Sequence, residues 1–446
     1  GRVPGVIGPI GTWQGNRVRG SRGMAMMSNR THALSSTADR PTTRSRIGPD
    51  VAVLVGALVL FMLMALQLTP FVPDDSYISY RYAANLAAGV GLRFNPGDAP
   101  VEGYSNFLWI VLLALATRAG IDPVAAGSLL GGLFGGRTIV ALWALLRRLG
   151  QTGLSLLVPV GLLAIAAPLL LYAVSGMETP LFAFLLLALM SAVERVWVRP
   201  SAASGAVLGV VGVLIALTRP EGIIALPVVL ACLAIFTPRT GRSTMWRSLA
   251  VAALLFVAVL AVYHLWRVAY FGAFWPTPFL SKGASGDALL GSVITNLRQF
   301  FVRQTHYYTP LAYYYAAITI PAVVAVATAW RRGERRPIEW TALILALAFA
   351  AVYLNFVDWM PGMRYYAPLV GLLLIPFSLL GPQLVNRDAK TQSGSAYLLL
   401  GTALALFSLS SLASLRLDSG QLQASTAASM VELGHWLRET MPPDAT

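Results

Sequence analysis

The sequence predicts an all-α membrane protein with many transmembrane helices, and three observations support that prediction. Only 12% of the 446 residues are charged, whereas soluble globular domains carry about 25%. Hydrophobic residues make up 56% of the chain, and its mean hydropathy is +0.66. The chain also contains apolar runs close to the roughly 20 residues that cross a bilayer. Because lipid offers the backbone no hydrogen-bond partners, these runs are expected to be helices.

The strongest apolar runs follow one another along most of the chain. They cover residues 51–68, 124–146, 154–172, 181–198, 249–270, 313–329, 341–356 and 397–415. With the shorter apolar stretches between them we count about eleven spans, which form a transmembrane domain over residues 49–416. Arg137 and Arg267 interrupt two of the runs. We expect both side chains to face the bundle interior, where a charge costs less than it does in lipid.

The net charge of +14 comes from arginine in the N-terminal tail and in a few short loops. Cytoplasmic loops of membrane proteins are rich in arginine and lysine, so this distribution implies no nucleic-acid partner. Residues 1–48 are rich in Gly, Ser and Arg, and we predict that they form a disordered cytoplasmic tail. The chain is therefore expected to be a multi-pass protein of the inner (plasma) membrane, with its N-terminus in the cytoplasm.

With this orientation, residues 71–121 form the first extracytoplasmic loop, in which the apolar stretch 107–118 suits an interfacial helix better than a span. The acidic residues test the orientation, because they were not used to assign it. Most of them fall on outer loops: Asp74, Asp75, Asp98, Glu102, Glu178, Glu221, Asp287 and Asp358. Those that fall inside lie near arginines or a lysine: Glu194, Glu334, Glu339 and Asp388. Polar groups gathered at one face indicate an interfacial enzyme site, whereas transporters tend to bury ionisable groups at mid-membrane.

The first extracytoplasmic loop carries the most informative motif. It reads Asp74-Asp75-Ser76-Tyr77-Ile78-Ser79-Tyr80-Arg81-Tyr82 and continues to Val101-Glu102-Gly103-Tyr104-Ser105-Asn106. Two adjacent carboxylates directly after a membrane exit can supply an ionised base whose neighbour orients it or binds a cation. The alternative interpretation is an acidic cap on a helix that begins near Ser76. That explains one aspartate but not the whole polar and aromatic stretch.

Two tight turns between spans also carry charged residues. Residues 175–180 place Glu178 between a glycine and a proline, and a simple helix-ending turn explains the backbone residues but not the glutamate. Residues 218–222 contain Arg219 and Glu221. These two side chains form a simple surface pair in one interpretation, and in the other Arg219 receives a phosphate.

Two further outer segments combine aromatic rings with cations. Residues 275–283 carry Lys282, one of only two lysines in the chain, in a segment whose aromatic residues alternatively serve only as interfacial anchors. Residues 358–366 carry Asp358, Trp359 and Arg364 between two spans. We interpret Lys282 and Arg364 as ligands of a phosphate.

These residues suit sugar transfer from a lipid carrier. ATP and nucleotide sugars are not available outside the cell, and the chain shows no phosphate-binding glycine loop, zinc spacing or Ser-His-Asp arrangement. A polyprenyl phosphate can deliver an activated sugar instead. Transfer then needs a base for the acceptor hydroxyl and cations for the leaving phosphate. We predict Asp75 as the base. Asp74 orients it or holds a divalent cation (Mg, Mn or Ca), for which the sequence shows no complete ligand set.

The other candidate residues take the remaining roles. The predicted contacts of the donor phosphate are Arg219, Lys282 and Arg364. The predicted contacts of the sugar or the glycan acceptor are Tyr77, Arg81, Glu102, Tyr104, Asn106, Glu178, Glu221, Asp358 and Trp359.

The order of these motifs resembles a known family. An acidic pair after the first span, a large first outer loop and a multi-span bundle look like the GT-C glycosyltransferases. The segments 74–82, 101–106, 175–179, 219–222, 276–282 and 358–365 resemble the actinobacterial terminal β-(1→2)-arabinofuranosyltransferases of arabinogalactan and lipoarabinomannan. The resemblance implies decaprenylphosphoryl-arabinofuranose as donor, an arabinan chain end as acceptor, and Asp74 and Asp75 as the catalytic centre. It also implies that residues 417–446 begin a soluble extracytoplasmic domain that continues past the sequence.

Two other functions stay open on the sequence alone. The first is a related enzyme that transfers a different sugar, such as mannose, from a polyprenyl phosphate. The second is a flippase for lipid-linked sugars that uses the same loops as gates.

Overall fold

The computed structural model describes residues 47–68, 72–238, 242–274, 309–355, 360, 363–385 and 395–413, together with residues 1, 436 and 439–440. Residues 48–446 form one compact unit, and residues 1–47 belong to another. The predicted tail (1–48) and the predicted start of a soluble domain (417–446) therefore lie almost wholly outside the described residues, and both stay predictions.

The regular elements among the described residues are all helices. In chain order they are α2 (Ile47–Leu66), α3 (Asp74–Ala87), α4 (Phe107–Arg118), α5 (Pro123–Arg148), α6 (Leu154–Ala164), α7 (Ala167–Ala173), α8 (Thr179–Val198), α9 (Ala202–Thr218), the short 3-10 helix η1 (Pro220–Ile224), α10 (Ala225–Phe236), α11 (Arg242–Phe271), α14 (Thr309–Arg331), α15 (Pro337–Tyr353), α16 (Leu369–Phe377) and α17 (Leu380–Val385). A further helix covers Ser395–Ala413.

The predicted membrane-spanning class agrees with the lengths of these helices. Six described helices are long and apolar enough to cross a bilayer, and the bent pair α6 and α7, with 48° between its halves, makes a seventh. Four of the other expected spans are apolar helices of fewer than 18 residues: Ala202–Thr218, Pro220–Phe236, Pro337–Tyr353 and Leu369–Gln383. The stretch at 107–118 is a separate helix of 12 residues, as predicted for an interfacial segment.

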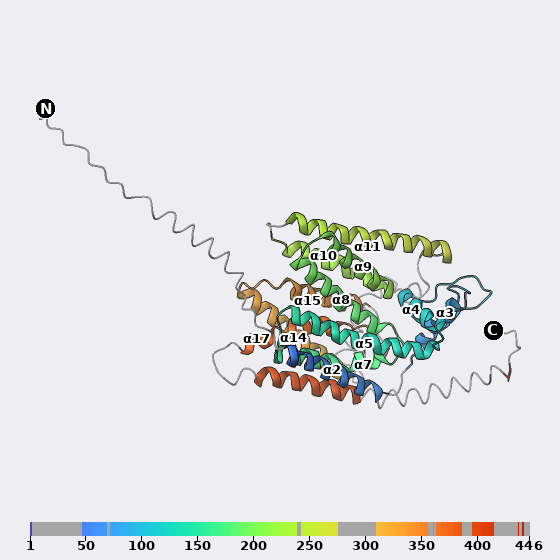
Figure 1. The fold of residues 1–446 in the computed structure, drawn as a ribbon, viewed down its shortest axis with the longest axis horizontal. Coiled ribbons are helices and arrows are strands. Elements are labelled where there is room, and N and C mark those ends of the chain that lie inside the picture. The colour runs from blue at the N-terminus through green and yellow to red at the C-terminus, as the bar shows by residue number, and fades with distance from the viewer. Residues whose placement is uncertain are drawn as a thin grey trace. The chain divides into compact units, whose positions relative to one another are not determined.

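Small residues let the helices of the bundle pack closely. Helices α9 and α11 lie side by side (Figure 1), and a Cβ atom on Gly205 would stand only 2.2 Å from the Ser248 carbonyl oxygen. Likewise, a Cβ on Gly131 of α5 would stand 2.4 Å from the Ala173 carbonyl oxygen of α7. Helices approach this closely in membranes when glycine lines the contact, because van der Waals packing drives their association there.

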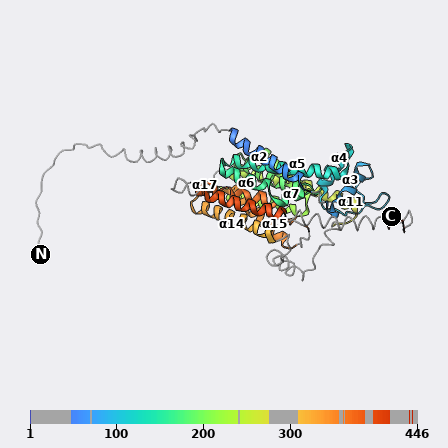
Figure 2. The same ribbon diagram turned by 90° about the horizontal axis from the view of Figure 1, so that it is seen from below.

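Polar residues sit at both ends of the bundle. Helices α3 and α4 lie at the end where α11 finishes, as both views show (Figures 1 and 2). At the opposite end, Arg148 pairs with Glu194 at 3.2 Å and Arg336 pairs with Glu334 at 2.8 Å. Glu194 and Glu334 thus have the arginine partners that the sequence suggested, whereas Asp388 lies outside the described residues.

The two arginines that interrupt apolar runs have different positions. Arg267 of α11 is 3% exposed and lies inside the bundle, which confirms the prediction. The prediction for Arg137 is wrong, because its side chain is exposed. Helix α5 turns Gly131, Phe134, Gly135 and Thr138 toward its neighbours, and Arg137 falls on another face.

Candidate functional site

The N-terminus of α3 presents the acidic pair at the end of the bundle where α11 finishes. Asp74 is exposed, and its carboxylate accepts a hydrogen bond from the Asp75 backbone N–H at 2.9 Å. The helix begins at Asp74 itself, after Pro73, and has no side-chain cap, so neither aspartate caps it as the alternative interpretation expected. The Asp75 side chain is 29% exposed and extends toward Arg364. The hydroxyl of Ser76 donates to the carbonyl oxygen of Ser175 at 3.0 Å, which fastens α3 to the turn before α8.

The turn before α8 is fixed by close contacts that require a glycine. Gly176 has a φ of 75°, and a Cβ there would stand 1.7 Å from the Tyr80 hydroxyl oxygen. The carbonyl of Gly176 accepts a hydrogen bond from the Trp109 indole N–H at 3.0 Å. Helices α3 and α4 therefore hold this turn from two sides. They fix the position of Glu178, which directly precedes α8.

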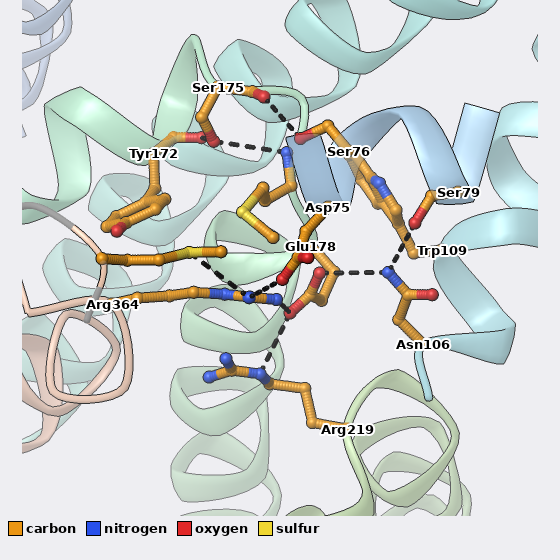
Figure 3. Close-up of polar contacts among 12 residues, drawn as sticks. Asp75, Ser76, Ser79, Asn106, Trp109, Tyr172, Ser175, Glu178, Arg219 and Arg364 are labelled. Atoms are coloured by element: carbon orange, nitrogen blue, oxygen red, sulfur yellow. Dashed lines mark hydrogen bonds and ion pairs between the residues drawn. The ribbon is translucent and has the colours of Figure 1, made fainter. Parts of the chain in front are cut away.

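Glu178 is the centre of the site (Figure 3). Its Oε1 atom lies 2.7 Å from Nη2 of Arg364 and 3.1 Å from Nε of Arg219. Its Oε2 atom accepts a hydrogen bond from Nδ2 of Asn106 at 3.1 Å, and Asn106 also donates to the Ser79 hydroxyl at 3.0 Å. The Glu178 side chain is only 1% exposed. One buried carboxylate thus joins three segments that are far apart in the sequence.

Arg364 connects this buried carboxylate to the exposed edge of the site. Its Nη1 atom lies 3.5 Å from Oδ2 of Asp75, a long contact compared with its bond to Glu178. The Arg364 side chain is 12% exposed. The preceding residue, Met363, has a φ of 54° and is the single non-glycine residue with positive φ in the described part of the chain. Such a conformation is unfavourable for methionine and recurs at functional sites, where the surrounding structure enforces it.

Arg219 lies deeper and is held between aromatic rings. Its guanidinium carbon is 5.5 Å from the centre of the Phe182 ring and 5.1 Å from that of Tyr365. Its Nε atom is also 3.4 Å from Oε1 of Glu221, which in turn accepts a hydrogen bond from the Tyr353 hydroxyl at 3.3 Å. Arg219 and Glu221 therefore form part of a buried network rather than the simple surface pair of the alternative interpretation.

We call Asp75, Asn106, Glu178, Arg219, Glu221 and Arg364 the Glu178 cluster. Burial alone would raise the pKa of the Glu178 carboxyl, but Arg364 and Arg219 outweigh it and lower that pKa to about 2. Glu178 is therefore ionised at neutral pH. With all five charged groups ionised, three carboxylates face two guanidinium groups, a net charge of −1. Within the described residues, Nη1 of Arg219 and Nε of Arg364 are buried and lack a hydrogen-bond partner.

Two predicted sugar-binding residues, Glu102 and Tyr104, belong to a different cluster. Glu102 pairs with Arg267 of α11 at 2.5 Å, and both side chains are about 5% exposed or less. The ring of Tyr104 packs edge-on against Tyr82 and Phe271, at 4.8 and 6.1 Å between ring centres. We call these five residues the Glu102 cluster. It fastens the first outer loop to α11, and the sugar-binding roles of Glu102 and Tyr104 stay predictions.

The remaining candidates have varied positions. Tyr77 is 56% exposed on α3, and its ring packs edge-on against Tyr80. Arg81 is exposed and donates from Nε to the Phe94 carbonyl oxygen at 3.0 Å, so it closes the first outer loop on itself. Lys282, Asp358 and Trp359 lie outside the described residues.

Of the aromatic residues around Arg219 and Glu221, Tyr365 lies in the predicted segment 358–366, but the sequence singled out neither Phe182 nor Tyr353. Phe182 and Tyr353 belong to apolar helices, where nothing in the pattern distinguishes them from core residues. For the predicted cation, the described part of the chain contains no group of three or more His, Cys, Asp or Glu side chains that would hold a metal ion. A divalent ion at Asp74 stays a prediction.

Comparison with known proteins identifies the fold. No protein-family model and no curated protein sequence matches the chain. Solved structures do match, among them crystal structures of ArnT from Cupriavidus metallidurans. The structure bound to undecaprenyl phosphate is 14% identical and has a TM-score of 0.55, and the match covers 90% of this chain and 82% of that one. The apo structure is 15% identical, covers 89% and 81%, and has a TM-score of 0.54. The chain therefore has the predicted all-α, GT-C-like membrane fold, and at these identities the likeness concerns the fold alone.

Proposed function

We propose that the chain is a membrane glycosyltransferase that takes a sugar from a polyprenyl-phosphate carrier at the outer face of the membrane. The observation that carries this proposal is the pairing of Asp75 with Arg364. A partly exposed carboxylate lies 3.5 Å from a guanidinium whose other side is held by buried Glu178. A base and a phosphate-binding cation side by side are what transfer from a sugar phosphate requires. The shared fold with ArnT, which has been crystallised with undecaprenyl phosphate, supports a polyprenyl-phosphate ligand.

The proposed step breaks one bond and forms another at the anomeric carbon. The acceptor hydroxyl oxygen attacks that carbon while Asp75 takes the hydroxyl proton. The bond between the carbon and the phosphate oxygen breaks, and its electron pair leaves on the phosphate of the lipid. Arg364 stabilises the resulting negative charge, so no acid is needed to protonate the leaving group.

We propose different tasks for the two arginines, and their positions support the difference. Arg364 reaches the exposed edge and is the proposed direct contact of the phosphate, together with Lys282. The Arg219 side chain is 4% exposed and lies behind Glu178, so we propose that it acts on the phosphate mainly through its positive charge. Asp74 orients Asp75 or holds a divalent ion in this proposal.

For the sugar, we propose arabinofuranose, transferred from decaprenylphosphoryl-arabinose to the ends of arabinan chains in arabinogalactan or lipoarabinomannan. The support is the order of the motifs in the sequence, from the acidic pair at 74–75 to the segment at 358–365. Competition between labelled arabinose and mannose donors tests this choice directly.

The proposal is tested by sugar transfer with purified protein. Radiolabelled decaprenylphosphoryl-arabinose and a synthetic arabinan oligosaccharide are incubated with the wild type, with Asp75→Asn and with Asp98→Asn. Asp98 is an exposed acid in the same outer loop, so its variant is a matched control. We expect transfer by the wild type and by Asp98→Asn, and a loss of roughly 100-fold or more in Asp75→Asn.

Other outcomes separate the alternatives. A wild type that binds the lipid but transfers neither arabinose nor mannose contradicts the enzyme proposal and favours a flippase. An Asp75→Asn variant that transfers as fast as the wild type contradicts the role of Asp75 as base.

A further inference from the structure

Each arginine of the Glu178 cluster faces two carboxylates. Arg219 Nε lies 3.1 Å from Glu178 and 3.4 Å from Glu221. Arg364 lies 2.7 Å from Glu178 and 3.5 Å from Asp75. The same atom, Oε1 of Glu178, makes both of the shorter contacts, as the two dashed lines that meet on it in Figure 3 show. A phosphate that arrives at Arg364 therefore meets a cation whose charge is already partly neutralised.

Because Glu178 is buried, its negative charge acts strongly on a ligand that binds beside it. The Glu178 side chain is 1% exposed, so water and salt screen it weakly. Its repulsion of a ligand grows in proportion to the ligand's negative charge. A phosphodiester carries one negative charge, whereas a phosphomonoester carries between one and two at neutral pH. Glu178 therefore weakens the binding of a monoester more than the binding of a diester.

The donor and the lipid product of the proposed reaction differ in this same charge. The donor, a sugar joined to a lipid phosphate, is a phosphodiester, and the lipid product is a phosphomonoester. Without Glu178, the two arginines would be opposed within the cluster by Asp75 and Glu221 at longer distances, and they would bind the more highly charged product more tightly than the donor. Slow product release would then limit turnover.

We propose that Glu178 is a positioning residue that holds Arg219 and Arg364 and, as their counter-ion, keeps the site from binding the lipid monophosphate product more tightly than the donor. This inference rests on the proposed function. Asn106 supports it, because its hydrogen bond to Oε2 fixes the carboxylate with Oε1 toward the arginines. Glu178 is thus not a sugar contact in this account but sets the charge selectivity of the phosphate site.

Direct binding of two lipids tests the proposal without sugar transfer. The probes are decaprenyl phosphate and its methyl diester, bound to the purified full chain in lipid nanodiscs. The variants are Glu178→Gln, Glu178→Asp and Glu102→Gln, with thermal melting to establish that each is folded. Glu102→Gln is the matched control, because it also removes a buried carboxylate that is paired with an arginine.

We expect the wild type, Glu178→Asp and Glu102→Gln to bind the two lipids with similar affinity. Glu178→Gln should bind the monophosphate at least about tenfold more tightly than the diester, because the neutral amide no longer opposes the second charge. A merely structural role of Glu178 would lower both affinities together.

Two results overturn this inference and leave the proposed function intact. One is a folded Glu178→Gln variant whose ratio of affinities equals that of the wild type. The other needs no variant: a wild type that itself binds the monophosphate about tenfold more tightly than the diester. If the wild type binds neither lipid, the polyprenyl-phosphate function fails and this inference fails with it. If the predicted affinities are found but no sugar is transferred, only the proposed function fails.

Discussion

Two buried ion-pair clusters in the described part of the chain differ in how completely their charges are matched. In the Glu102 cluster one carboxylate meets one guanidinium at 2.5 Å, and Arg267 also donates to the Phe274 carbonyl oxygen. In the Glu178 cluster one carboxylate oxygen is shared by two guanidinium groups, and each of these retains a buried nitrogen without a partner in the described part of the chain. Among the described residues, the ion pair of the first cluster has no buried charged atom without a partner, although the Tyr104 hydroxyl lacks one, and this cluster holds a loop in place. The second has unused hydrogen-bonding capacity beside an exposed edge, as a binding site requires.

The first prediction concerns the arginines and carries the largest expected effect. Arg364→Gln should lower kcat by roughly 100- to 1,000-fold, because a preorganised donor to developing negative charge is lost. Arg267→Gln should lower the melting temperature and leave the kcat of the folded protein near the wild-type value. Kinetics and melting curves of both variants test the comparison. An equal loss of kcat in the two would show that the Glu102 cluster takes part in the reaction.

The second prediction concerns the removal of each central carboxylate. Glu178→Gln should destabilise the fold by roughly 3–5 kcal/mol, because two buried guanidinium groups lose the carboxylate that they share. Glu102→Gln should cost less, because burial opposes the charge of the Glu102 carboxylate. The two variants should differ in their response to inorganic phosphate. Only the Glu178→Gln variant should regain melting temperature, since its arginines can bind the added anion. A similar recovery in Glu102→Gln, or none in either, would contradict the assignment of an anion site to the Glu178 cluster.

The third prediction is that acid affects the two clusters in opposite directions. The pKa of Glu178 is about 2 in the folded protein, below its ordinary value of 4.5. Its ionised form therefore contributes stability above pH 4.5, about 3 kcal/mol, which is lost as the pH falls toward 2. Burial raises the pKa of Glu102 above 4.5 despite its bond to Arg267. The folded protein therefore binds this proton more tightly than the unfolded chain does, and Glu102 favours folding more as the pH falls.

Melting curves between pH 7 and pH 3 test these signs. The difference in melting temperature between the wild type and Glu178→Gln should shrink below pH 4.5, because glutamine does not titrate. The difference between the wild type and Glu102→Gln should not shrink over the same range. If both differences shrink alike, the two carboxylates do not differ in environment as the structure indicates.

The comparison also shows what the sequence can and cannot predict. Apolar runs predicted the helices, because span length and hydropathy are local properties. The partners of Glu178 lie 41 and 186 positions away at Arg219 and Arg364, and only the packing of α8, η1 and the segment after α15 selects them. The sequence grouped Glu102 with Glu178 as sugar contacts, since both are acids in outer loops.

Arg137 and Arg267 illustrate the same limit within the spans. Each is a single arginine in an apolar run, and the sequence treats them alike. The rotation of each helix about its own axis decides which one is buried, and tertiary packing sets that rotation. Around Arg219, the rings of Phe182 and Tyr353 escaped prediction for a similar reason, because a functional aromatic residue in a membrane helix resembles any other core residue.

The smallest predicted effect tests whether the Glu102 cluster is purely structural. The Tyr82 hydroxyl donates to the Val101 carbonyl oxygen at 2.6 Å and accepts from the Gly103 N–H at 3.0 Å, so it fixes the backbone on both sides of Glu102. Tyr82→Phe keeps the ring packing against Tyr104 and should destabilise the fold by about 1–2 kcal/mol through the unpaired backbone groups. Sugar transfer by the folded variant should match the wild type, as measured by kcat and by the KM for the acceptor. A selective rise in acceptor KM without loss of stability would support the predicted acceptor contacts of Glu102 and Tyr104, because a loop that only holds the fold together does not affect the binding of one substrate alone.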